Sequence, residues 1–204
     1  MTDLRALADD QLETLRTLIR RCPDLRALTV RQPWTDLIMA GVKDVENRPW
    51  PVPFTLPHHY ACDHCGTRVL VDDVRCTACQ SDQLRPDGPF PFRLGIHAAV
   101  TPTTHSDAWW EWDQHVGQPG TEPDHYGALL GTVEVTGCHH DHEHWDEDAP
   151  FPFLMDTDQG WQCSSWAEPD VYHWTLTDPR PLDVPIPMRG MLGLWRLEFV
   201  EMAP

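Results

Sequence analysis

The sequence predicts an α+β protein in which a small mixed β-barrel is flanked by helices. Three observations favour this class: five or six short strands occur with only two or three helices, irregular loops separate them, and no internal repeat is visible. A chain of 204 residues can hold one substantial domain with insertions. We expect an N-terminal amphipathic helix in residues 1–24 and the barrel domain in residues 25–204.

Each predicted helix begins or ends at a residue that favours such a boundary. Leucines recur at helical spacing before Pro23, which disfavours continuation of the first helix. Pro33 stands near the first position of the second helix and Gly41 follows its end, while Ser106 is a favourable N-cap for the third. The predicted helices are residues 3–21, 34–40 and 106–115.

The strands are predicted from short apolar runs between turn-forming residues. One of these runs, residues 128–136, is almost continuously apolar and is interrupted by Glu134. The predicted strands are residues 26–30, 42–47, 92–100, 128–136, 172–176 and 192–199.

Two Cys-x-x-Cys pairs stand ten residues apart, a spacing that suits one tetrahedral zinc ion. The predicted ligands are Cys62, Cys65, Cys76 and Cys79. The stretch between the pairs, residues 66–75, is expected to form a short hairpin. Two disulfides are the alternative, but the other three cysteines are scattered singly and the N-terminus does not resemble a signal peptide, so zinc is favoured. Prolines bracket the segment, which predicts a zinc ribbon inserted at residues 58–86.

A second insertion is predicted at residues 138–166, which are rich in acidic residues, His and Trp and lack a regular period. The neighbouring histidines here are a weak signal for a second metal site, and a solvated polar loop is the favoured interpretation. These histidines are His139, His140, His142 and His144.

The formal net charge of −17 disfavours binding along an extended phosphate backbone. Several basic residues nevertheless lie in the apolar-rich parts of the chain, so a local basic pocket is compatible with this charge. No apolar run approaches the length of a membrane span. We therefore expect a cytoplasmic protein that has no membrane partner.

The segment Leu28-Thr29-Val30-Arg31-Gln32-Pro33-Trp34 and the one that follows it, which contains Gly41, Lys43, Glu46 and Arg48 in a Gly-x-Lys-x-x-Glu-x-Arg pattern, resemble the start of an ASCH domain. Segments near residues 94–98, 127–133 and 172–190 resemble later strands of that family. The resemblance covers residues 25–199, apart from the two insertions. The N-terminal helix is a further departure from the minimal domain.

The resemblance implies a compact β-barrel similar to the PUA and EVE/YTH folds, with a cleft beside the motif. It also implies binding of RNA or of other nucleic-acid components. Some small relatives hydrolyse the amide of acetylcytidine, and some are reported to be ribonucleases.

The candidate ligand-binding residues lie in and around this motif. In a regular strand Lys43 and Glu46 would point to opposite faces, so a bulge or a later strand start is needed for both to reach one cleft. Glu46 and Arg48 can form an ion pair that is either structural or part of a base-binding floor. Tryptophans beside the motif could stack on a nucleobase, although a core position is the more common role. The candidates are Gln32, Trp34, Lys43, Glu46, Asn47, Arg48, Trp50, His97 and Arg189.

Three functions remain open from the sequence. The favoured one is a module that binds RNA, DNA or a nucleotide and recognises a single, modified or unmodified, base. A hydrolase acting on an acylated nucleoside or on RNA would use Lys43 and Glu46, but Glu46 occupies the position of the threonine nucleophile of the amidohydrolase relatives. Thr35 or Ser106 would replace that nucleophile only if the fold brings it beside Lys43. The third is a protein-interaction adaptor that uses the ribbon and the acidic loop.

Overall fold

The computed structural model describes residues 7–22, 24–53, 59–62, 65, 67–70, 75, 78–81, 84–86, 90–118, 121–141, 155–157 and 160–197. The chain divides into two compact units. Unit 1 consists of Met1–Asp44, Arg93–Glu134 and Leu176–Pro204, and unit 2 consists of Val45–Phe92 and Val135–Thr175.

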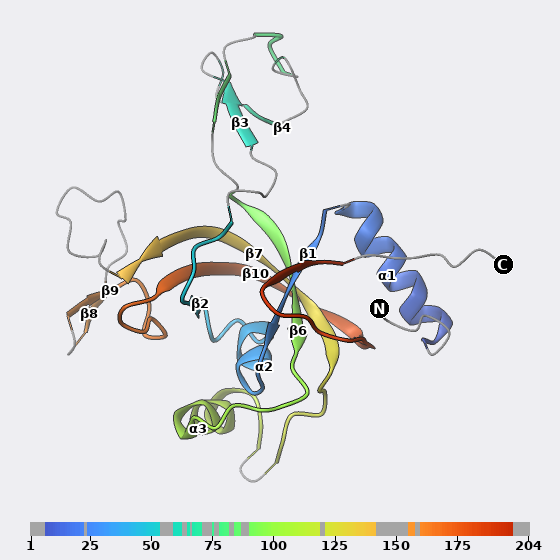
Figure 1. The fold of residues 1–204 in the computed structure, drawn as a ribbon, viewed down its shortest axis with the longest axis vertical. Coiled ribbons are helices and arrows are strands. Elements are labelled where there is room, and N and C mark those ends of the chain that lie inside the picture. The colour runs from blue at the N-terminus through green and yellow to red at the C-terminus, as the bar shows by residue number, and fades with distance from the viewer. Residues whose placement is uncertain are drawn as a thin grey trace. The chain divides into compact units, whose positions relative to one another are not determined.

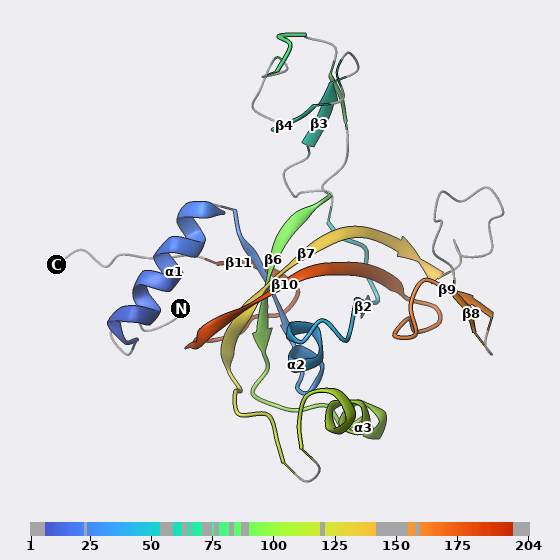
Figure 2. The ribbon, with the colours of Figure 1, turned by 180° about the vertical axis from the view of Figure 1, so that it is seen from behind.

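The structure has the mixed α+β composition that the sequence predicts (Figure 1). The strand order of its main sheet is β11-β1-β6-β7-β10-β2. In this sheet β1 (Arg26–Val30) pairs in parallel with β6 (Phe92–Ala98) and antiparallel with β11 (Leu194–Arg196), so the sheet is mixed. The long neighbouring strands β7 (Ala128–His140) and β10 (Tyr172–Pro187) run side by side in both views (Figures 1 and 2).

Unit 1 contains the helices α1 (Asp9–Arg21), α2 (Trp34–Met39) and α3 (Ser106–His115). The apolar side of α1 packs through Leu15 on a cluster that includes Ala27 of β1, Leu129 of β7 and Trp195 of β11. The N-terminal helix therefore covers part of the core of this unit, as its amphipathic pattern predicts. No described helix combines the length and the apolar character that crossing a membrane would require.

Unit 2 contains β2 (Val45–Arg48), which pairs antiparallel with the start of β10. Trp174 of β10 is fully buried, and its ring meets the ring of Trp50 edge-on at a centroid distance of 4.9 Å. The unit also contains a two-stranded sheet of β8 (Met155–Thr157) and β9 (Gly160–Gln162). The strands β8 and β9, like the end of β7, fall in the stretch 138–166 that the sequence marks as a loop.

The predicted ribbon segment forms a separate three-stranded antiparallel sheet in the order β4-β3-β5. Its strands are β3 (His59–Cys62), β4 (Arg68–Leu70) and β5 (Leu84–Pro86). The backbone of β4 pairs with β3, and residues 71–74 of the expected hairpin lie outside the described residues. The side chain of Cys62 and all of Cys76 also lie outside them, whereas Cys65 is exposed and its Sγ lies 3.2 Å from Thr67 Oγ1, and Cys79 is half-buried.

The second strand begins later than the sequence predicts. The carbonyl of Leu37, near the end of α2, accepts hydrogen bonds from the amides of both Val42 and Lys43. These two hydrogen bonds hold residues 42 and 43 against the end of the helix, and β2 begins at Val45 instead of residue 42. Lys43 lies before the strand, so the strict alternation of a strand does not apply between it and Glu46.

Candidate functional site

A hydrogen-bonded network fixes the beginning of α2. The side-chain amide of Gln32, which is fully buried, donates to Asp36 Oδ1 at 2.7 Å and to the carbonyl of His125 at 3.0 Å. Trp112 of α3 donates its Nε1–H to Asp36 Oδ2 at 3.3 Å. These bonds connect α2 to α3 and hold the helix in one position.

Burial raises the pKa of Asp36, and the hydrogen bonds from Gln32 and Trp112 oppose this rise without cancelling it. Gln32, a candidate ligand-binding residue from the sequence, thus has its side-chain amide engaged in this network.

The two hydroxyls that could replace the missing nucleophile differ in exposure. Thr35 is fully buried, and its Oγ1 has no hydrogen-bond partner among the residues that the structure describes. Ser106, the other hydroxyl considered from the sequence, is exposed and lies 3.1 Å from Asp107 Oδ1 through its Oγ.

The first half of the motif places a lysine over an aromatic ring. The ammonium of Lys43 lies 5.6 Å from the ring centroid of Trp34, within cation–π range. Lys43 is only 5% exposed, which is rare for lysine, whereas Trp34 is half-buried. The ammonium of Lys43 therefore covers part of the Trp34 indole ring, and the remaining part of the Trp34 side chain faces solvent.

The second half of the motif lies in unit 2 and contains the ion pair that the spacing suggests. Arg48 Nη2 lies 2.8 Å from Glu46 Oε1, and the Glu46 side chain is 8% exposed. Trp50, which follows the strand, packs edge-on against Trp174 and accepts the indole N–H of Trp174 through its backbone carbonyl at 3.4 Å.

Asn47 connects β2 to the turn that precedes β10. Its Nδ2 donates to the carbonyl of Trp166 at 2.8 Å, and its Oδ1 accepts the amide of Glu168 at 3.3 Å. The side chain of Asn47 thus bridges two backbone groups of this turn, and both ends of its amide are used.

The remaining two candidates lie elsewhere in unit 1. His97 is 1% exposed, lies 2.9 Å from the carbonyl of Met188 through its Nε2, and contacts Trp195 edge-on. Because consecutive side chains of a strand point to opposite faces, His97 points away from the face of Ala98, which packs against Met39 of α2. Burial lowers the pKa of His97. Arg189 is exposed in the segment that follows β10.

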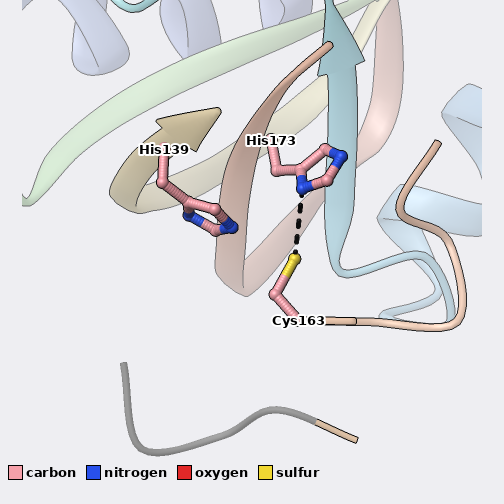
Figure 3. Close-up of side chains that lie close together, drawn as sticks. All are labelled: His139, Cys163 and His173. Atoms are coloured by element: carbon pink, nitrogen blue, oxygen red, sulfur yellow. Dashed lines mark hydrogen bonds between the residues drawn. The ribbon is translucent and has the colours of Figure 1, made fainter. Parts of the chain in front are cut away.

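A second group of polar side chains lies in unit 2 (Figure 3). His139 from β7, His173 from β10 and Cys163, which directly follows β9, each offer a ligand atom, and these three atoms lie within 4.8 Å of one another. The sulfur of Cys163 lies 3.4 Å from His173 Nδ1. His139 is 2% exposed and His173 is fully buried, whereas Cys163 is half-buried.

The structure brings together some of the predicted residues and adds others. Trp34 and Lys43 are in contact, and so are Glu46 and Arg48. Sequence reasoning considered His139 only with its neighbours along the chain, and it treated Cys163 as an isolated cysteine. Strand pairing between distant segments brings His139 and Cys163 together with His173, and no local spacing in the sequence indicates this group.

Comparison with known proteins identifies the family. A comparison with curated protein sequences gives no match. The sequence model of the ASCH domain matches residues 28–185, which is most of the chain and includes both halves of the motif. ASCH domains are PUA-like domains of an RNA-binding type. The chain therefore belongs to the ASCH domain family.

Proposed function

We propose that this protein is a nucleic-acid-binding module that recognises a single base of RNA, using the exposed part of Trp34 as a stacking surface. The observation that carries the proposal is the position of Lys43 over the Trp34 ring. An indole held from one side by a cation loses little conformational freedom when a base stacks on the other.

The surroundings of Trp34 support this proposal. The network of Gln32, Asp36 and Trp112 fixes the helix that carries Trp34. A rigid aromatic surface with one nearby positive charge suits a base and its phosphate, and it needs few other phosphate contacts. Such a site is compatible with the net charge of −17.

The test measures the affinity of short single-stranded RNA for the wild-type protein and for Trp34→Ala. Loss of a stacked base costs about 1–3 kcal/mol, so we expect binding to weaken about 5- to 150-fold. Trp110→Ala is the matched control, because Trp110 lies on α3 and is 61% exposed. Equal affinities of the wild type and Trp34→Ala would refute the stacking surface.

Lys43→Met separates a role in binding from a role in folding. Methionine keeps most of the apolar stem and removes the charge, and a hydrogen bond to a charged group contributes about 1.5–3 kcal/mol. We expect RNA binding to weaken about 10-fold or more while the protein remains folded. Release of a product from acetylcytidine or from the RNA, abolished in Lys43→Met, would instead favour the hydrolase. Absence of both binding and turnover would favour the protein-interaction adaptor.

We also propose that the inserted ribbon holds one structural zinc ion through Cys62, Cys65, Cys76 and Cys79. The three-stranded sheet supports this, because Cys62 ends β3 and Cys65 follows it before β4, while the other cysteine pair falls between β4 and β5. Four thiolates form a typical closed site for zinc. Metal analysis of Cys62→Ser/Cys76→Ser should show the loss of one zinc ion per chain relative to the wild type, and an unchanged zinc content would refute this site.

A further inference from the structure

We propose that His139, Cys163 and His173 form a second metal site, distinct from the ribbon, that binds a zinc ion with an open fourth position. Three segments far apart in the sequence supply the donors, and the ligand atoms lie within 4.8 Å of one another (Figure 3). One sulfur and two imidazole nitrogens are the donor types that zinc prefers.

The distances fit one ion after small side-chain movements. Two ligands of a tetrahedral zinc ion lie about 3.3–3.6 Å apart, given bonds of about 2.0 Å to nitrogen and 2.3 Å to sulfur. The sulfur of Cys163 and His173 Nδ1 are already 3.4 Å apart. The other pairs, at up to 4.8 Å, need to approach by at most about 1.5 Å, which side-chain rotation can supply.

The environment of His173 is that of a metal ligand. Its Nε2 lies 2.7 Å from the carbonyl of Glu168, which accepts the ring N–H. This bond leaves Nδ1, the nitrogen that faces Cys163, as the one with a lone pair. Metal-binding histidines characteristically donate their other ring N–H to a carbonyl or a carboxylate in this way.

The turn that supplies both Cys163 and the Glu168 carbonyl is itself held in place. Asn47 bridges the Trp166 carbonyl and the Glu168 amide, and the Ser164 hydroxyl accepts the amide of Trp166 at 3.1 Å. The site is therefore supported by fixed backbone on the side of Cys163. Asn47 acts here as a positioning residue for His173.

A hydrogen-bonded Cys163–His173 pair alone is the simpler alternative, but it does not account for His139. The His139 ring lies 5.3 Å from the His173 ring, nearly perpendicular to it, and is 2% exposed. A third donor buried beside the pair completes the ligand set of an open zinc site, which has three protein ligands and a water molecule. The partial exposure of Cys163 leaves a path for that water.

Binding of zinc at this site requires the thiolate, so the proton of the Cys163 thiol is released to solvent as the sulfur–zinc bond forms. The two histidines bind as neutral imidazoles. The site with its ion then carries one positive charge, and the open position can hold water or an anionic group.

The experiment removes the ribbon's ligands first, so that any remaining metal is bound elsewhere. The full chain with Cys62, Cys65, Cys76 and Cys79 all changed to Ser is loaded with Zn²⁺, desalted and analysed for zinc. We expect about one zinc per chain to be retained. Adding Cys163→Ser or His139→Gln should abolish this retention, whereas His140→Gln should leave it unchanged, because the ring of His140 contacts Tyr172.

Loading with Co²⁺ gives a second measurement that reports on the ligand itself. A thiolate–cobalt charge-transfer band should appear in the variant without ribbon cysteines and disappear on Cys163→Ser. If the variant without ribbon cysteines does not fold, the zinc content of the full chain is compared instead, and Cys163→Ser should lose about one ion relative to His140→Gln.

The proposal is overturned if the folded variant without ribbon cysteines retains no zinc, or if Cys163→Ser and His140→Gln retain equal amounts. It is also overturned if Cys163 is alkylated at the same rate with and without Zn²⁺, because a bound thiolate is protected. RNA binding is not part of this test, so its outcome is independent of the Trp34 proposal.

Discussion

Replacement of Asn47 by Ala tests whether this residue holds the fold or contacts a ligand. The sequence places it among the candidate ligand-binding residues, whereas the structure shows its amide bonded to the carbonyl of Trp166 and the amide of Glu168. Each of these bonds contributes about 0.5–1.5 kcal/mol, so Asn47→Ala should lower the free energy of unfolding by about 1–3 kcal/mol. For a chain of this size, the midpoint of thermal unfolding should fall by about 2–12 °C.

Asn47→Asp is the informative companion variant. It keeps the acceptor for the Glu168 amide but replaces the donor with a carboxylate oxygen, which would face the Trp166 carbonyl across the present 2.8 Å contact. We expect it to destabilise the protein at least as much as Asn47→Ala does, because two acceptors then oppose each other.

The assay is urea unfolding followed by circular dichroism, combined with amide hydrogen exchange. The amide of Glu168 should lose protection in Asn47→Ala, because its acceptor has been removed. If both variants have wild-type stability and Glu168 keeps its protection, the structural role of Asn47 is refuted. A loss of RNA affinity in those stable variants would then assign Asn47 to the ligand.

Two further predictions concern the glycines of β7 and the buried His97. Gly131→Ala should destabilise the protein by about 1–3 kcal/mol, since an added Cβ would meet the Arg180 carbonyl at 2.5 Å and Pro181 Cα at 2.8 Å. Gly137→Ala should be milder in the same thermal assay, because its Cβ would meet the end of a Thr175 side chain at 3.0 Å. A reversed order of the two variants would contradict the close approach of β7 and β10. Burial lowers the pKa of His97 in the folded state, so the unfolded state binds more protons once the pH falls below 6.5, and stability should decrease from there toward the folded-state pKa. His97→Gln should flatten this decrease in urea titrations, and an unchanged pH profile would contradict the burial effect.

The regular elements of unit 1 were largely predictable from local signals. The strand at Arg26–Val30 and the helix at Ser106–His115 have the predicted bounds, and the left-handed Gly41, with φ of +73°, follows the end of α2 as expected. The prediction of Ser106 as the N-cap is wrong, because the N-cap position is His105 and Ser106 is already the first helical residue. Each of these elements has its own apolar period and a breaker next to it. Local sequence therefore suffices to predict an element when its apolar period and the residues at its ends favour the structure that it adopts in the fold.

The extent of β10 was not predictable in the same way. The sequence predicts that this strand ends at Leu176, but it continues to Pro187 through Pro179, Pro181 and Pro185. Proline lacks the amide proton of a strand and normally argues against one. In the part of the chain that the structure describes, β2 pairs with β10 from Tyr172 to Thr175, so the later part of β10 can carry prolines on the side that β2 does not reach. Whether β10 can continue through these prolines therefore depends on which of its residues pair with β2, and the sequence of β10 alone does not show that.

The candidate sites also differ in whether local sequence predicts them. Trp34 and Lys43 were found because the family motif and its flanking helix are contiguous in the sequence. The group of His139, Cys163 and His173 was missed because strand pairing and a turn bring its members together from three segments. A cysteine with no neighbour of its kind carries no metal signal in the sequence alone.

The packing of α1 has a consequence for any attempt to isolate this domain. The family match ends at residues 28 and 185, yet Leu15, Leu25 and Trp195 belong to the same apolar cluster and lie outside it, and Gln11 donates to the carbonyl of Pro185 at 2.8 Å. A fragment trimmed to the matched residues would lack Ala27 as well and would leave Leu129 facing water. The unit that folds is therefore larger than the unit that is shared by the family, and expression boundaries should be placed outside α1 and β11.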